Sequence, residues 1–245
     1  AAGCAQAGLE CHLLLGGVEP AVYDGNLYLS KVSGANIYFT GENRKGEDIE
    51  RVKNELIKDG KNPYVIPYGG SNLTGALGFV NAVIELKQQL HNAEVNIDYI
   101  FFASSSGGTQ AGMYLGKLLS GLSSEFMPIF IDKEESENDL RDLIFDIIQE
   151  GRKLLGIEKN IEKDALRIIR GYDDAGYGVV TDNERYAIKT MGKYEGIILD
   201  PVYTGRAFFG MLDHIEKRMI PAGSKVMYWH TGGFPSNFYY AKEMF

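Results

Sequence analysis

Residues 97–119 read IDYIFFASSSGGTQAGMYLGKLL, and this stretch decides the fold class. An apolar run ends in three serines and two glycines, and a helical pattern follows at once. A buried strand that turns through a glycine-rich loop into a helix is typical of parallel α/β sheets. Helix N-termini attract anions, so the loop at residues 105–109 is a candidate phosphate site. A tight turn that binds nothing is the competing interpretation.

Strand and helix patterns alternate along the rest of the chain, which favours an α/β fold with largely parallel sheets. Further strands are predicted at 13–15, 36–39, 64–66, 127–131, 196–199 and 225–229. Helices are predicted at 27–32, at 48–59, along an apolar stripe at 140–154, and after the capping-box pair Thr181 and Glu184. The glycine-rich segment 68–78 suggests two domains, 1–67 and 68–245.

Two other predicted strands end in polar sequence. Asp200, Tyr203 and Thr204 follow one of them, and His230 and Thr231 follow the other. Ligands of open α/β sheets bind beyond the carboxyl ends of the strands, so these loops and the 105–109 loop are expected to line one site. We expect Asp200 to bind turn amides and His230 to bind backbone, with no catalytic role for either.

Composition further limits the classes of function that the chain could have. The chain of 245 residues has 33 acidic and 25 basic residues and a net charge of -8, which argues against a nucleic-acid partner. Its longest apolar runs have strand length, so we expect no membrane segment. Two cysteines without metal-ligand spacing favour a reducing cytoplasm and no metal. The 105–109 loop lacks nucleoside-triphosphate and dinucleotide patterns, so a small phosphate-bearing ligand fits better.

Five ordered motifs resemble the D-cysteine desulfhydrase and 1-aminocyclopropane-1-carboxylate (ACC) deaminase family. They are YVIPYGGSNLTGALG (64–78), ASSSGGTQAGMYLG (103–116), GYGVVT (176–181), EGIILDPVYTGRA (195–207) and HTGG (230–233). The resemblance implies fold type II of the pyridoxal-phosphate (PLP) enzymes, shared with the tryptophan synthase β subunit, in which a smaller α/β domain accompanies a larger PLP-binding one. It also implies the cofactor pyridoxal 5'-phosphate, a small amino-acid substrate and a homodimer.

The resemblance assigns roles to individual residues. The positions that match its phosphate loop are Ser105, Ser106, Gly107, Gly108 and Thr109. Tyr203 and Tyr177 match its two catalytic tyrosines, and Thr204 and Thr231 match positions facing the cofactor ring and the substrate.

The two threonines bear on the choice of activity. In the deaminase branch these positions are typically glutamate and leucine, so the threonines indicate a D-cysteine desulfhydrase. Its reaction is α,β-elimination of D-cysteine to pyruvate, hydrogen sulfide and ammonia. An ACC deaminase, which forms 2-oxobutyrate and ammonia, or a related D-amino-acid lyase is the alternative.

One family feature has no counterpart. The family's Schiff-base lysine lies in a Gly-Asn-Lys-like segment near its N-terminus, and the present sequence contains no such motif. Lys31, Lys45 and Lys117 lie in segments that match other parts of the family. We therefore expect the N-terminal part of the fold to be missing from these residues. A non-catalytic fragment that binds PLP or another phosphate ester is the alternative from a different class.

Overall fold

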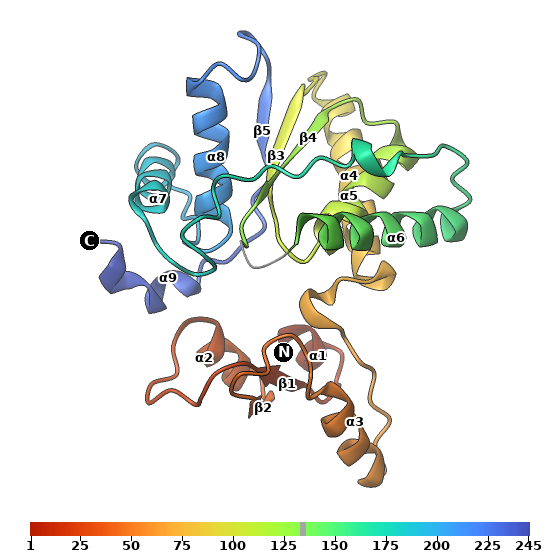
Figure 1. The fold of residues 1–245 in the computed structure, drawn as a ribbon, viewed down its shortest axis with the longest axis vertical. Helices are drawn as coiled ribbons and strands as arrows, with labels where there is room; N and C mark the ends of the chain where they lie inside the picture. The colour runs from red at the N-terminus through yellow and green to blue at the C-terminus, as the bar shows by residue number, and fades with distance from the viewer. Residues whose placement is uncertain (133–135) are drawn as a thin grey trace. The chain divides into compact units, whose positions relative to one another are not determined.

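The computed structural model describes residues 1–132 and 136–245, and it confirms the alternation of helices and strands (Figure 1). The elements are α1 (Ala2–Gln6), β1 (His12–Leu15), α2 (Gly25–Val32), β2 (Asn36–Phe39), α3 (Ile49–Lys58), α4 (Leu73–Asn92), β3 (Tyr99–Ser104), α5 (Gly108–Ser120), β4 (Glu125–Phe130), α6 (Glu137–Leu155), α7 (Asp182–Glu195), α8 (Thr204–Glu216), β5 (Val226–Tyr228) and α9 (Ser236–Tyr239). Single turns of 3-10 helix occur at Tyr68–Gly70, Lys163–Ala165 and Ala241–Glu243. Within the described ranges, no helix combines the length and apolar character needed to cross a bilayer.

The chain divides into two compact units. The first unit comprises Ala1–Tyr68 and Pro235–Ala241, and the second comprises Gly69–Phe234 and Lys242–Phe245. The expected domain ranges, 1–67 and 68–245, differ from these units mainly in the segment Pro235–Ala241. That segment joins the first unit because α9 packs against α2. No local sequence pattern predicts this contact.

The first unit holds a two-stranded parallel sheet. β1 pairs with β2 in a register that runs from His12 opposite Asn36 to Leu15 opposite Phe39. α3 buries Val52. These three elements follow the predicted ranges to within a few residues.

Two predicted strands were wrong, because residues 64–66 and 196–199 join no ladder in the described sheets. Residues 64–66 lie between Pro63 and Pro67, and prolines cannot donate ladder hydrogen bonds. Residues 196–199 begin at Gly196, whose left-handed φ of 67° ends α7. Tyr64 and Ile66 are largely solvent-exposed. In the second segment Ile197 and Ile198 are exposed, whereas Leu199 is buried although it belongs to no strand of the described sheets.

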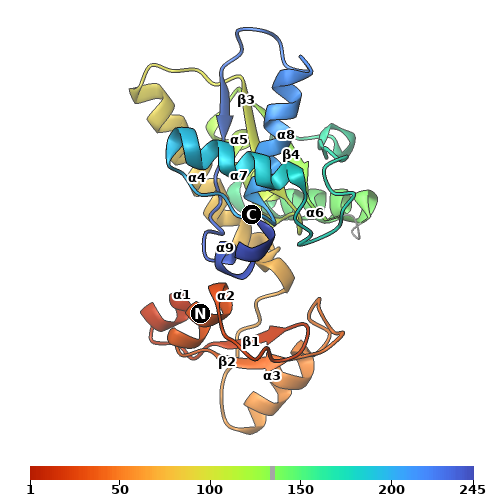
Figure 2. The same cartoon turned by 90° about the vertical axis from the view of Figure 1, so that its left-hand side faces the viewer.

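The second unit has a parallel sheet, in the order β4–β3–β5, with helices on both faces (Figure 1). Alternate residues of β3 point to opposite faces of the sheet. Ile100 and Phe102 pack with α4, α5 and α6, whereas Phe101 and Ala103 pack on the α8 side. α7 lies beside α8 (Figure 2). This arrangement explains why β3 reads as one continuous apolar run.

The predicted helices of the second unit form with small departures. α6 buries Leu140, Ile144, Ile147 and Ile148, but Leu143 and Leu154 of the predicted stripe are exposed. The capping box is present at the start of α7, where the Thr181 N–H donates to Glu184 Oε2 at 2.8 Å.

Glycines let α4 and α5 pack unusually closely. A Cβ atom at Gly112 would lie 2.3 Å from the Ala76 carbonyl oxygen, and one at Gly116 would lie 2.6 Å from the Val83 Cβ. Neither position could hold a side chain without moving the neighbouring helix. The N-terminus of α5, and hence the 105–109 loop, therefore depends on glycine at these contacts.

We expect Gly112→Ala to destabilise the protein by about 1–3 kcal/mol, the usual cost of overpacking a core. The matched control is Gly78→Ala in α4, where nothing lies within 4 Å of the added carbon. That variant should gain up to about 1 kcal/mol from helix propensity. Urea unfolding midpoints of both variants test this, and equal midpoints would contradict the close-packing argument.

Candidate active site

The 105–109 loop joins β3 to α5, as predicted. Gly107 has a left-handed φ of 86° and immediately precedes the helix. The Ser71 hydroxyl braces the loop, because it donates to Ser106 Oγ at 2.7 Å and accepts the Gly108 N–H at 3.2 Å. A Cβ atom at Gly69 would lie 2.2 Å from Ser106 Oγ, so that segment also fits closely against the loop.

The geometry of this loop suits a phosphate group. The first N–H groups of a helix have no acceptor within the helix. In α5 they begin at Gly108, whose own N–H donates to Ser71 Oγ. Ser105, Ser106 and Thr109 are partly exposed and add hydroxyl donors. Ser104 is buried and its hydroxyl is bonded to Gln110 Oε1 at 2.7 Å, so the loop proper begins at Ser105. The residues present fit the phosphate of a small cofactor.

Asp200 organises the turn before α8. Its Oδ2 accepts the N–H groups of Val202 and Tyr203, both at 2.9 Å. Its Oδ1 accepts the Thr204 N–H at 2.8 Å and the Thr204 hydroxyl at 2.7 Å. The expectation that Asp200 binds turn amides is confirmed. The Thr204 hydroxyl also accepts the Asp200 N–H at 2.7 Å, so it is engaged within the turn.

The structure brings Tyr177 and Tyr203 together. Their hydroxyls are hydrogen-bonded to each other, and their rings meet edge to face with centroids 5.8 Å apart. Partial burial raises the pKa of Tyr177, an effect that the hydrogen bond between the two tyrosine hydroxyls partly offsets and that the carboxylates of Asp132 and Asp200 reinforce. At neutral pH Tyr177 is therefore a neutral phenol that can donate a proton.

The 230–233 loop lies against the Asp200 turn. His230 Nδ1 accepts the Gly232 N–H at 2.9 Å, and its Nε2 lies 3.3 Å from the Ile198 carbonyl oxygen, which confirms that this ring binds backbone. A Cβ atom at Gly233 would lie 2.6 Å from the Asp200 carboxyl carbon. Thr231 is exposed.

Hydrogen bonds place these segments at the carboxyl edge of the second unit's sheet. The Ile131 N–H, just past β4, donates to the Ser104 carbonyl at the end of β3, at 3.1 Å. The Tyr228 hydroxyl at the end of β5 donates to the Thr204 carbonyl at 2.7 Å. The strand-end loops therefore gather at one edge, where the ligands of such sheets bind.

Two residues with structural roles in this region escaped the sequence analysis. Arg206 is fully buried and Ser71 braces the 105–109 loop. A single charged residue among the small and apolar residues at the start of α8 could have indicated that Arg206 is buried. Ser71 carried no signal beyond its place in a glycine-rich segment.

Lys117 does not serve the 105–109 loop. Its Nζ donates to the Ser124 carbonyl at 2.6 Å near the far end of α5, nine residues and roughly 14 Å of helix beyond Gly108. This position agrees with its assignment to another part of the fold.

Comparison with known proteins identifies the family. The model of the family described as pyridoxal-phosphate dependent enzyme matches residues 1–232. The ACC deaminase of Rhizobium rhizogenes is 34% identical over 249 residues, covering 96% of this chain and 72% of the relative. That of Methylobacterium nodulans is 33% identical over 249 residues, with the same coverage.

A solved structure agrees with this assignment. The crystal structure of an ACC deaminase homologue matches with a TM-score of 0.88 and 33% identity, over 99% of this chain and 71% of that one. The fold is therefore the fold type II α/β architecture with parallel sheets. With the family match, the chain belongs to the pyridoxal-phosphate dependent enzymes, as a lyase or deaminase that uses pyridoxal 5'-phosphate.

Proposed function

We propose that this protein is a PLP-dependent amino-acid lyase that converts D-cysteine to pyruvate, hydrogen sulfide and ammonia. The observation that carries the choice of substrate is Thr204, a neutral residue directly after Tyr203 at the start of α8. The proposal also assigns binding of the cofactor phosphate to Ser105, Ser106, Gly107, Gly108 and Thr109.

The tyrosine pair supports a role in proton transfer. The cofactor, when bound, supplies stabilisation of negative charge at the substrate Cα. Tyr177 and Tyr203 share a hydrogen bond, and the raised pKa of Tyr177 means that its hydroxyl is protonated at neutral pH before any proton is transferred. Such a pair can hand a proton to a departing thiolate and recover it through the shared bond. We therefore propose these two tyrosines as the catalytic residues.

Thr204 supports elimination of a good leaving group. Its hydroxyl is already bonded to Asp200, and a hydroxyl cannot hold a pyridine nitrogen protonated as a carboxylic acid can. Loss of a thiolate demands less of the cofactor than opening of a cyclopropane ring. We propose that Thr204 and Thr231 face the cofactor ring and the substrate, and that their neutrality suits D-cysteine.

ACC deaminase is the second candidate. It is favoured by the names of the relatives, two of which are ACC deaminases at 33–34% identity. The two candidates share the cofactor, the phosphate loop and the tyrosines, and they differ in the bond that breaks.

Parallel assays decide between the two substrates. We expect the full-length protein, which carries the family's Schiff-base lysine, to release sulfide from D-cysteine and no 2-oxobutyrate from ACC once it is loaded with cofactor. Protein freed of PLP is the control and should release neither product. The reverse pattern would establish the deaminase. If the loaded full-length protein releases neither product, the remaining interpretation is a protein that binds PLP without catalysing either reaction.

We further propose a cytoplasmic homodimer. The resemblance to the family supports the dimer, and two free cysteines, Cys4 and Cys11, are compatible with a reducing compartment. Light scattering during gel filtration measures the mass and so tests the oligomeric state.

A further inference from the structure

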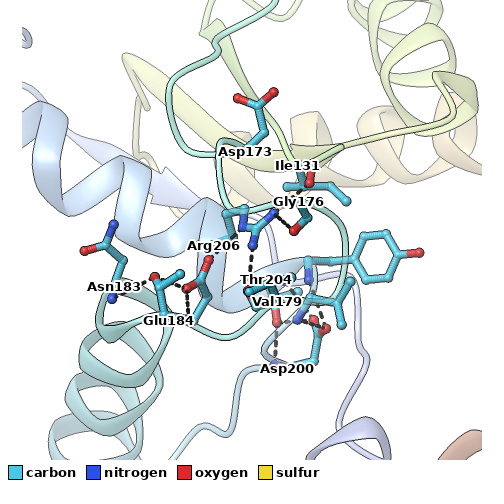
Figure 3. A network of polar contacts seen from close by, with 12 residues as sticks. Ile131, Asp173, Gly176, Val179, Asn183, Glu184, Asp200, Thr204 and Arg206 are labelled. Carbon is cyan, nitrogen blue, oxygen red and sulfur yellow. Dashed lines mark hydrogen bonds and ion pairs between the residues drawn. The ribbon is translucent and has the colours of Figure 1, made fainter. Parts of the chain in front are cut away.

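We propose that Arg206 is a positioning residue that fixes Tyr177 against Tyr203. This inference rests on the proposed function only for the role of the tyrosines. The contacts that support it belong to the described residues of the second unit, and Figure 3 shows them around the Arg206 guanidinium.

Arg206 is among the most deeply buried side chains of the protein. It is 1% exposed, and its guanidinium makes four hydrogen bonds. Nε donates to Glu184 Oε1 at 2.7 Å, and Nη1 donates to the carbonyl of Ile131 at 2.8 Å (Figure 3). The remaining two bonds, one from each Nη atom, go to the loop that carries Tyr177.

These two bonds flank Tyr177. Nη1 donates to the Gly176 carbonyl at 3.0 Å, and Nη2 donates to the Val179 carbonyl at 2.9 Å. The segment between them belongs to no helix or strand, and its two glycines, Gly176 and Gly178, have left-handed φ values of 98° and 72°. A loop without ladder hydrogen bonds needs other contacts to hold one conformation, and the guanidinium supplies them on both sides of the tyrosine.

Arg206 also belongs to the helix that presents the other tyrosine. Tyr203 directly precedes α8, and Arg206 is the third residue of that helix. One rigid side chain therefore ties the segment that carries Tyr177 to the helix that begins at Tyr203. The hydrogen bond between the two tyrosine hydroxyls is the contact that this tie controls.

Glu184 completes the arrangement. It is 2% exposed and pairs with Arg206, while its other oxygen accepts the Thr181 N–H at 2.8 Å. Buried ion pairs add little net stability, because desolvation offsets their attraction. Their geometry is more informative here, since a guanidinium is a planar fork of donors and a lysine ammonium is a single point. Lysine at position 206 cannot reach all four acceptors.

The first test measures the titration of Tyr177 in Arg206→Lys. Tyrosinate absorbance is followed as the pH rises, and the Tyr177 contribution is isolated by subtracting the same protein carrying Tyr177→Phe. We expect the pKa of Tyr177 to fall toward the ordinary tyrosine value, because the freed loop exposes the remaining buried part of a residue that is already 46% exposed. This readout needs neither cofactor nor substrate.

The matched control is Arg152→Lys. Arg152 also donates to two backbone carbonyls, those of Lys159 and Glu158, both at 2.8 Å, but it lies in α6 and contacts neither tyrosine segment. It should leave the Tyr177 titration unchanged. In the full-length enzyme loaded with cofactor, kcat should fall about 10- to 100-fold in Arg206→Lys, with a much smaller change in KM, and should stay constant in Arg152→Lys.

Glu184→Gln keeps the inference testable if Arg206→Lys does not fold. Glutamine preserves the capping pattern and the shape of the side chain but weakens the hold on Arg206. We expect the Tyr177 pKa to shift in the same direction by a smaller amount. An unchanged Tyr177 titration in whichever of these variants folds would overturn the inference. Failure of the kinetic arm alone, with the titration shifted, would count against the proposed role of the tyrosines instead.

Discussion

Gly107→Ala is expected to weaken phosphate binding by at least about tenfold, the loss that follows from about 1.4 kcal/mol of binding energy. Gly107 adopts a left-handed φ of 86°, which costs a residue with a Cβ atom about 1–2 kcal/mol. The added carbon would also lie 2.9 Å from Ile144 Cγ1 and 3.1 Å from Leu140 Cδ1. The loop must therefore move, and its N–H groups will no longer converge on one anion.

The control is Gly121→Ala at the other end of the same helix. Gly121 has a similar φ of 66°, but nothing lies within 4 Å of the added carbon. Gly121→Ala should lose stability from the strained left-handed backbone without disturbing the 105–109 loop. Titration calorimetry with inorganic phosphate and with PLP measures both variants. Equal binding by the two variants would show that the 105–109 loop is not the phosphate site.

The features that the sequence predicted correctly are local ones. The loop at 105–109, the capping box of α7 and the amide-binding role of Asp200 all depend on residues within a few positions of one another. Turns, helix caps and apolar periodicity are determined by residues that are close together in the sequence. The predicted strands at 64–66 and 196–199 were wrong because an apolar run does not reveal whether a partner strand exists.

The features that the sequence missed depend on distant contacts. Arg206 bonds to Ile131, 75 positions earlier in the chain, and Tyr177 meets Tyr203 across 26 positions. No spacing rule links such residues. The sequence could identify the two tyrosines only through family resemblance. It could not show that Arg206 connects the loop that carries Tyr177 to the helix that follows Tyr203.

Asp200→Ala is expected to destabilise the protein by about 3–5 kcal/mol. The substitution removes the acceptor for three N–H groups, those of Val202, Tyr203 and Thr204, and for the Thr204 hydroxyl. Each buried donor left without a partner costs about 1–3 kcal/mol, and water can satisfy only those nearest the surface. Chemical denaturation measures the loss, and Asp182→Ala, at a fully exposed carboxylate in α7, should change stability by less than about 0.5 kcal/mol.

Asp200→Asn separates a structural role from a catalytic one. The amide keeps one oxygen that can accept, so this variant should lose roughly half as much stability as Asp200→Ala, and the Tyr203 turn should largely persist. If Asp200 acts only by binding the turn, kcat will follow the stability of the turn and recover in Asp200→Asn relative to Asp200→Ala. Loss of activity in Asp200→Asn without loss of stability would instead place the carboxylate in the reaction.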